Sequence, residues 1–202
     1  RHFSRMILMV KVVNTPGAKI IASDVESAYL NGKQNKSTGT KKIYTTQMIG
    51  FFRPELKGKV REVIGNQFGI SNAGFIWRQT YHRAFLSMGF TTNRADSCLY
   101  HLRKTNEWID VAMTVDDGFT AYFGENLFNW YKNRVNTFFK MNFSKLDKFV
   151  GYEFTHLEKK MIITFTAKTF INKMLDEAKM QNCKPTLSPY QSGVLVEYLI
   201  DE

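Results

Sequence analysis

The order of apolar segments in this 202-residue chain predicts an α+β fold. Once insertions are set aside, the expected elements run strand, helix, strand, strand, helix, strand, which is the ferredoxin-like βαββαβ pattern. A content of 44% hydrophobic residues, with 17 Phe, 9 Tyr and 3 Trp, is enough for the core of one large domain. No apolar run is long enough to cross a bilayer, so we expect no membrane partner.

The first expected elements are a helix and a buried strand. Apolar residues recur at helical spacing from 3 to 13, and Pro16-Gly17 ends this helix. Residues 18–25 form an apolar run that predicts a buried strand. The segment 33–62 that follows is polar and basic, and we interpret it as a β-rich excursion from the core.

The central elements are a long helix and a series of strands. Between 70 and 88 apolar residues recur every three or four positions, which predicts a helix with one buried face. Strands are expected at 97–102, 108–115 and 119–123. Asp117-Gly118, between the last two, is a strong signal for a two-residue hairpin turn.

The last third of the chain continues this alternation of helices and strands. We expect a helix at 125–140, strands at 149–154 and 161–165, and a helix with one apolar face at 166–180. Pro185 and Pro189 then bracket an extended tail.

Three aspartates lie where expected strands end. Asp24 closes the strand at 18–25, and Asp116 and Asp117 follow the strand at 108–115. In the βαββαβ topology we expect these two strands to be adjacent, which brings the three carboxylates together. Such a group can hold two divalent cations for nucleotidyl transfer. An Asp-Asp-Gly triplet alone is also common in simple turns, so the prediction depends on the pairing of the strands.

The balance of charge favours an anionic partner. The chain has a net charge of +10, and such a balance most often indicates nucleic-acid binding. Eight cations lie in the excursion: Lys33, Lys36, Lys41, Lys42, Arg53, Lys57, Lys59 and Arg61. These cations could line a polymerase-like groove. The alternative is a solvated face or a basic arm that binds RNA without specificity, and the charge alone does not distinguish these possibilities. We expect this surface to contact nucleic acid in either case.

The cysteines and histidines indicate neither disulfides nor zinc. Cys98 and Cys183 are far apart in the sequence, which favours free thiols in an intracellular, reducing compartment. The four histidines are scattered, so a zinc site is not expected. The chain begins with Arg1 and shows no signal-peptide pattern, which suggests a fragment or a processed product.

Short segments along the chain resemble, in order and spacing, motifs of copia-type retrotransposon reverse transcriptases. The run Asp-Val-Glu-Ser-Ala-Tyr-Leu-Asn-Gly at 24–32 resembles their first catalytic motif, and Thr-Val-Asp-Asp at 114–117 resembles Tyr-Val-Asp-Asp. Further similar segments lie at 43–51, 68–77, 86–90, 95–100, 149–153 and 182–185. The resemblance implies a reverse-transcriptase palm with partial fingers over 1–190, in which 33–62 belongs to the fingers, and a tail at 191–202.

The resemblance also implies roles for individual residues. Asp24, Asp116 and Asp117 would be the catalytic residues and the ligands of two Mg²⁺ ions. Tyr29 would be an aromatic gate against a ribose 2′-OH, although a packed strand-end aromatic is the alternative. Gly69 and Asn72 would contact the incoming nucleotide, and the partner would be RNA or an RNA/DNA hybrid.

The sequence departs from the family at positions that would face phosphate or template. Gly65, Ser71 and Phe75 stand where the family carries basic residues. Each lost contact could cost about 2–4 kcal/mol of transition-state stabilisation. No counterpart of the N-terminal fingers segment or of an RNase H domain is found, so other chains could supply or replace fingers, thumb and RNase H.

Two functions from different classes are compatible with these observations. The first is RNA-directed DNA polymerisation by a two-metal mechanism. The second is a catalytically inactive, basic subunit with a structural or RNA-binding role in a larger ribonucleoprotein. A third, an RNA-recognition module that shares only the topology, would need exposed aromatic residues on its central strands. Primer extension on an RNA template separates the first two.

Overall fold

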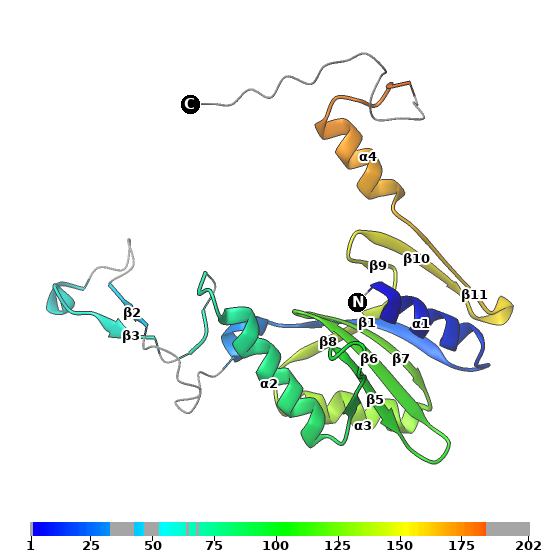
Figure 1. Ribbon diagram of the computed structural model, residues 1–202, viewed down its shortest axis with the longest axis horizontal. Helices are drawn as coiled ribbons and strands as arrows, with labels where there is room; N and C mark the ends of the chain where they lie inside the picture. Colours follow the sequence, from blue (N-terminus) through cyan, green and yellow to red (C-terminus); the bar gives the residue numbers. More distant parts are fainter. Residues whose placement is uncertain (1, 33–42, 47–52, 64, 68, 185–202) are drawn as a thin grey trace.

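The computed structural model describes residues 2–32, 43–46, 53–63, 65–67 and 69–184. It shows a mixed fold of helices and antiparallel sheets, which confirms the predicted α+β class (Figure 1). In these ranges no helix is both long and apolar enough to cross a membrane. The tail at 191–202, with Pro185 and Pro189, lies outside the described residues.

A six-stranded antiparallel sheet is the centre of the fold. Its strands are β1 (Lys19–Val25), β4 (Thr91–Thr92), β5 (Leu99–Arg103), β6 (Trp108–Thr114), β7 (Asp117–Phe123) and β8 (Met141–Lys145). They lie in the order β4-β5-β6-β7-β1-β8, so that β1 is held between β7 and β8.

Helices cover both faces of this sheet. They are α1 (His2–Val13), α2 (Ala73–Ser87) and α3 (Glu125–Val135). Alternate residues of the strands pack into two separate cores. Val111 packs with residues of α2 and α3, whereas its neighbour Ala112 packs with residues of α1. This two-sided burial explains why β6 and β7 are apolar almost throughout.

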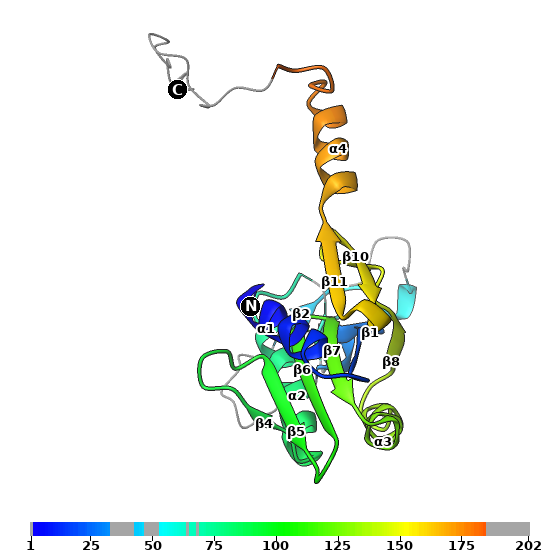
Figure 2. The ribbon, with the colours of Figure 1, turned by 90° about the vertical axis from the view of Figure 1, so that its right-hand side faces the viewer.

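Smaller elements surround the central sheet. Strands β9 (Lys148–Phe149), β10 (Tyr152–Leu157) and β11 (Ile162–Thr166) form a three-stranded sheet, and β2 (Tyr44–Thr45) pairs with β3 (Arg61–Glu62). Short 3₁₀ helices are η1 (Ala28–Asn31), η3 (Pro54–Leu56) and η4 (Glu158–Lys160). Helix α4 (Lys168–Glu177) follows β11 and extends away from the central sheet (Figure 2).

The expected helices are confirmed, but the end of α3 and the strand after it were predicted wrongly. The expected helix at 125–140 ends at Val135, and residues 141–145 form β8, the strand that pairs with β1. The amide of Asn136 explains the change. Its Nδ2 donates to the Lys132 carbonyl at 2.8 Å, and its Oδ1 accepts from the Met141 backbone N–H at 3.0 Å. Asn136 therefore ends the helix and fixes the start of β8.

The expected strand at 149–154 is also interrupted. A turn at Val150-Gly151, where φ is 47° and 80°, separates β9 from β10. The chain reverses there, and Tyr152 pairs with Phe149.

The predicted pairing of 18–25 with 108–115 is wrong, because β1 pairs with β7 instead of β6. The strand beside β1 is the returning arm of the hairpin, β7, and β6 lies beyond it in the order β6-β7-β1-β8. The predicted turn is also misplaced: Thr114 pairs with Asp117, so the turn is Val115-Asp116, and Asp117-Gly118 already belongs to β7. Gly118 is required by packing: a Cβ there would lie 2.3 Å from the Ser23 Oγ of β1. The Asp-Gly signal therefore marks a close approach of two strands, not a turn.

Candidate functional site

Strand pairing brings the three aspartates to one end of the sheet. Asp24 on β1 lies directly opposite Asp117 on β7. Opposite residues of an antiparallel pair project from the same face, with Cβ atoms about 4.5–5.5 Å apart. The Val25 backbone N–H donates to the Asp116 carbonyl at 3.0 Å, so the turn that carries Asp116 is joined to β1. The aspartates therefore lie together, as expected from the sequence, but the strand beside β1 is β7 and not β6.

At this acid site, burial, and then the charge of neighbouring carboxylates, raises the pKa of both Asp24 and Asp117. Partial burial raises the pKa of Asp24, and the charges of Asp116 and Glu26 raise it further. Partial burial also raises the pKa of Asp117, as do Asp116 and Asp24, whereas Arg5 opposes this shift. Close carboxylates that repel one another are the usual electrostatic setting of a cation site.

The number of ligands limits the kind of metal that the acid site can hold. Across the described ranges, no three His, Cys, Asp or Glu side chains are grouped closely enough to hold an ion by themselves. Mg²⁺ is usually bound by one or two carboxylates together with waters and substrate phosphates. The pair Asp24 and Asp117 meets that requirement, since its ligands are hard oxygens.

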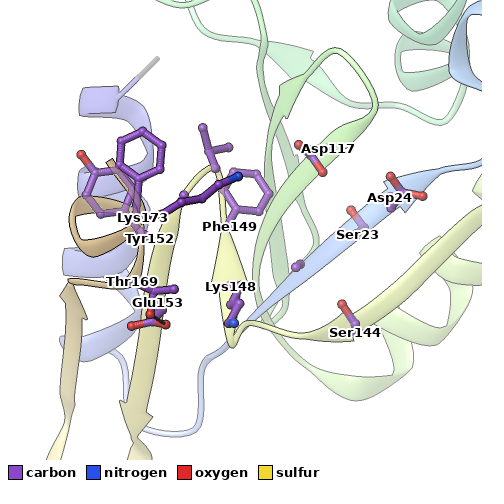
Figure 3. A pocket seen from close by; sticks show the side chains of 14 residues that line it. Ser23, Asp24, Asp117, Ser144, Lys148, Phe149, Tyr152, Glu153, Thr169 and Lys173 are labelled. Carbon is purple, nitrogen blue, oxygen red and sulfur yellow. Dashed lines mark hydrogen bonds between the residues drawn. The ribbon is translucent and has the colours of Figure 1, made fainter. Parts of the chain in front are cut away.

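A pocket of about 420 Å³ opens beside the acid pair (Figure 3). Ser23, Asp24 and Asp117 from the central sheet form one side. The other side comes from the β9–β10 turn and from α4, and includes Lys148, Phe149, Tyr152, Thr169, Phe170 and Lys173. Acidic, basic and aromatic side chains therefore all line this pocket.

The far side of the pocket was not predicted. The segment 149–153 carried a family resemblance, but no role followed from it. Lys173 and Phe170 gave no signal beyond the apolar periodicity of their helix. Only the tertiary fold places α4 opposite Asp24, so these contributions could not be inferred from the sequence.

The expected nucleotide-binding residues lie around the start of α2. Tyr29 of η1 is half-buried, and a Cβ at Gly74 would lie 3.8 Å from its ring, which places the ring against the first turn of α2. Asn72 precedes α2 but makes no capping hydrogen bond, and its buried Oδ1 has no hydrogen-bond partner among the described residues. Gly69 has φ 85° and open space around it. None of the three lines the pocket beside Asp24.

The segment 114–117, called the acid hairpin below, has an unusual backbone, and a hydrogen bond from α2 stabilises it. Val115 has φ 57°, a left-handed conformation that is rare for a β-branched residue. The buried Trp77 of α2 donates its indole N–H to the Val115 carbonyl at 2.6 Å. Trp77 is held in turn by edge-to-face contacts with Tyr81 and Phe139, at centroid distances of 5.4 and 5.1 Å.

A family model described as reverse transcriptase (RNA-dependent DNA polymerase) matches residues 2–192. The chain belongs to the copia-type reverse transcriptase family. One relative is the putative transposon Ty5-1 protein of Saccharomyces cerevisiae, which is 26% identical over 167 residues. The alignment covers 82% of this chain and 52% of that protein, so the chain spans about half the length of the relative.

Three of the segments that resemble reverse-transcriptase motifs therefore contribute to the acid pair and the pocket beside it. The segments 24–32 and 114–117 supply the acid pair, and 149–153 forms part of the facing wall of the pocket. The family's basic positions are occupied by Gly65, Ser71 and Phe75, all of which are exposed.

The basic excursion is described in part. Arg53, Lys57, Lys59 and Arg61 lie around η3 and β3, and all four are exposed. Lys33, Lys36, Lys41 and Lys42 lie outside the described residues. The prediction that this reverse-transcriptase surface contacts nucleic acid therefore stays a prediction.

Proposed function

We propose that this chain is the palm, with part of the fingers, of an RNA-directed DNA polymerase in which Asp24 and Asp117 carry nucleotidyl transfer. The observation that carries the proposal is the β1–β7 register, which sets the two carboxylates opposite each other at the mouth of the pocket. The strand order β6-β7-β1-β8, with α2 and α3 on one face, also follows the ferredoxin-like pattern of a palm.

In this proposal the carboxylates of Asp24 and Asp117, with Asp116 beside them, hold the cations. When bound, two Mg²⁺ ions activate the attacking hydroxyl and stabilise the leaving phosphate. Because the protein supplies few ligands, Mg²⁺ should bind weakly alone and tightly only with a deoxynucleotide. Calorimetric titration with Mg²⁺ measures this. Binding that is independent of nucleotide, or unchanged in Asp116→Asn and Asp24→Asn, would count against the metal site.

The remaining residues orient the nucleic acid. Tyr152 and Phe170 offer flat apolar surfaces on which a base or a sugar can pack. Lys148 and Lys173 bring positive charge to the same wall, where backbone phosphates would lie. Tyr29 would exclude a ribose 2′-OH near the start of α2, with Gly69 and Asn72 beside the nucleotide. RNA or an RNA/DNA hybrid is the proposed partner.

A second function is favoured by a specific observation. Gly65, Ser71 and Phe75 stand at positions where the family carries basic residues. This suits a catalytically inactive subunit that binds RNA within a larger ribonucleoprotein. Other protein chains would then supply or replace the fingers, the thumb and the RNase H domain. The free thiols of Cys98 and Cys183 suit an intracellular, reducing compartment under either proposal.

Primer extension on an RNA template, with Mg²⁺ and deoxynucleotides, tests the proposal. The wild-type chain should extend the primer, and Asp24→Asn or Asp117→Asn should lower the rate by at least about 10²-fold, the usual effect of removing one transition-state contact. The matched control is Asp176→Asn, which alters an exposed acid on α4 and should leave the rate unchanged. Equal rates in all variants would contradict the assignment. RNA binding without any extension would favour the inactive subunit.

A further inference from the structure

Arg5 of α1 reaches both sides of the pocket. Its Nη2 donates a hydrogen bond to the Thr114 Oγ1 at the end of β6. Its guanidinium carbon lies 4.9 Å from the centre of the Phe149 ring, a cation–π contact with β9. One side chain thus touches the acid hairpin and the facing wall.

The two contacts of Arg5 are made to positions that determine the geometry of the pocket. Thr114 is followed directly by the Val115-Asp116 turn, whose left-handed Val115 requires support from its neighbours. Phe149 lines the same pocket as Asp117 and packs edge-on against Phe119 of β7 at a centroid distance of 5.2 Å. The position of Phe149 relative to the hairpin therefore affects the shape of the pocket.

Helix α1 is a fixed support for Arg5. The Ser4 hydroxyl donates to Asp96 at 2.6 Å, and the Lys11 ammonium donates to the buried Asp110 at 2.7 Å. Only an arginine has the planar fork that can donate to a hydroxyl while its face lies over an aromatic ring. A lysine could keep the charge but would lose one of the two contacts.

We propose that Arg5 is a positioning residue that holds the acid hairpin and the Phe149 wall at a fixed separation. The catalytic consequence of this role rests on the proposed polymerase function, whereas its structural consequence does not. Arg5 acts through Thr114 and Phe149 and is not assigned a contact with substrate.

The backbone N–H of Val25 provides a direct readout of the hairpin. It is buried in the central sheet and donates to the Asp116 carbonyl at 3.0 Å. If Arg5 holds the turn, Arg5→Met should speed hydrogen exchange at Val25 by about tenfold, the effect expected from losing one hydrogen bond to a charged group. Exchange at the middle of β6 should change much less.

Lys11→Met is the matched control for this experiment. Lys11 lies on the same helix, forms an ion pair with Asp110 and lies 3.4 Å from the centre of the Trp108 ring, and both contacts are on β6 away from the Val115-Asp116 turn. Its loss should affect exchange at Val25 no more than exchange elsewhere in the sheet. Exchange at Val25 that responds equally to both variants, or to neither, would overturn the proposal.

Primer extension then tests the catalytic consequence. Arg5→Met should lower kcat about tenfold or more with little change in KM for the nucleotide, and Arg5→Lys should recover part of the loss. Thr114→Val removes the hydrogen-bond acceptor, so Arg5→Met should have a smaller effect in that background. Additive effects, or a loss confined to KM, would contradict a positioning role. If the wild-type chain extends no primer, the polymerase function fails, and exchange at Val25 still decides the role of Arg5.

Discussion

The indole N–H of Trp77 donates to the Val115 carbonyl at 2.6 Å and so joins helix α2 to the acid hairpin. Val115 adopts a left-handed backbone, and Asp116 and Asp117 follow it directly. The hydrogen bond thus lies between the main apolar core and the residues proposed to bind metal. It gives the hairpin a partner that a short turn could not supply by itself.

Replacing Trp77 by Phe should destabilise the fold by about 1–3 kcal/mol, because a partly buried carbonyl loses its donor while most of the ring packing remains. The free energy of unfolding in urea measures this. Trp130→Phe is the control, since Trp130 is an exposed residue of α3. Equal stability of the two variants would show that the bond to Val115 contributes nothing.

Gly118→Ala should destabilise the sheet by about 1–3 kcal/mol through overpacking, because its Cβ would meet the Ser23 Oγ at 2.3 Å. Ser23→Ala removes that atom and leaves the next contact, with the Met113 Sδ, at 3.2 Å. The double variant should therefore be more stable than Gly118→Ala alone. Thermal unfolding of the three variants checks this, and a double variant less stable than either single one would refute it.

Asp117→Asn should stabilise the metal-free chain at pH 7, by less than about 1 kcal/mol because the site is partly solvated. The pKa of Asp117 is raised by burial and then by Asp116 and Asp24, so its ionised form costs stability. That cost appears as the pH rises through the folded-state pKa and is absent below the ordinary value of 3.8.

Urea unfolding between pH 3 and pH 7 measures the effect of Asp117→Asn, and Asp176→Asn serves as the control. The stability advantage of Asp117→Asn should shrink as the pH falls through that window. An advantage that persists below pH 3.8, or a loss of stability at pH 7, would mean that Asp117 is not repelled by its neighbours.

Replacing Lys57 and Lys59 by Ala should flatten the salt dependence of RNA binding. Each phosphate contact contributes a slope of about −0.7 for a single strand or −0.9 for a duplex, so two lost contacts should change the slope by roughly 1.5 units. Lys159 and Lys160, an exposed pair in η4, provide the matched control. An unchanged slope would identify Lys57 and Lys59 as part of a solvated face.

Local patterns were sufficient to predict the helices and the meeting of the aspartates. The periodicity at 70–88 marks the buried face of α2, and the apolar run at 18–25 marks β1. Tertiary packing decides which strand lies beside β1, and the position of the hairpin turn was predicted wrongly from Asp117-Gly118. Gly118 is needed for its approach to Ser23, which is a tertiary contact without a local pattern.

Other features depend on contacts between distant residues. The aromatic pair Phe138-Phe139 made the helix at 125–140 look continuous, and only the hydrogen bonds of Asn136 show why it ends at Val135. The wall formed by Phe149 and the bond from Trp77 to Val115 likewise join segments that are far apart in the chain.

Asp24 and Asp117 are proposed to bind the catalytic metal. Cleavage mapping with Fe²⁺ in place of Mg²⁺ locates the bound ion along the chain. With hydrogen peroxide as the oxidant and ascorbate to regenerate the reduced ion, bound Fe²⁺ generates hydroxyl radicals that cut the backbone close to the ion. In the presence of a deoxynucleotide and a primed RNA template, cuts should fall near residue 24 and near residues 116–117, and both should disappear in Asp24→Asn. Cuts elsewhere, or cuts that persist in that variant, would contradict the claim.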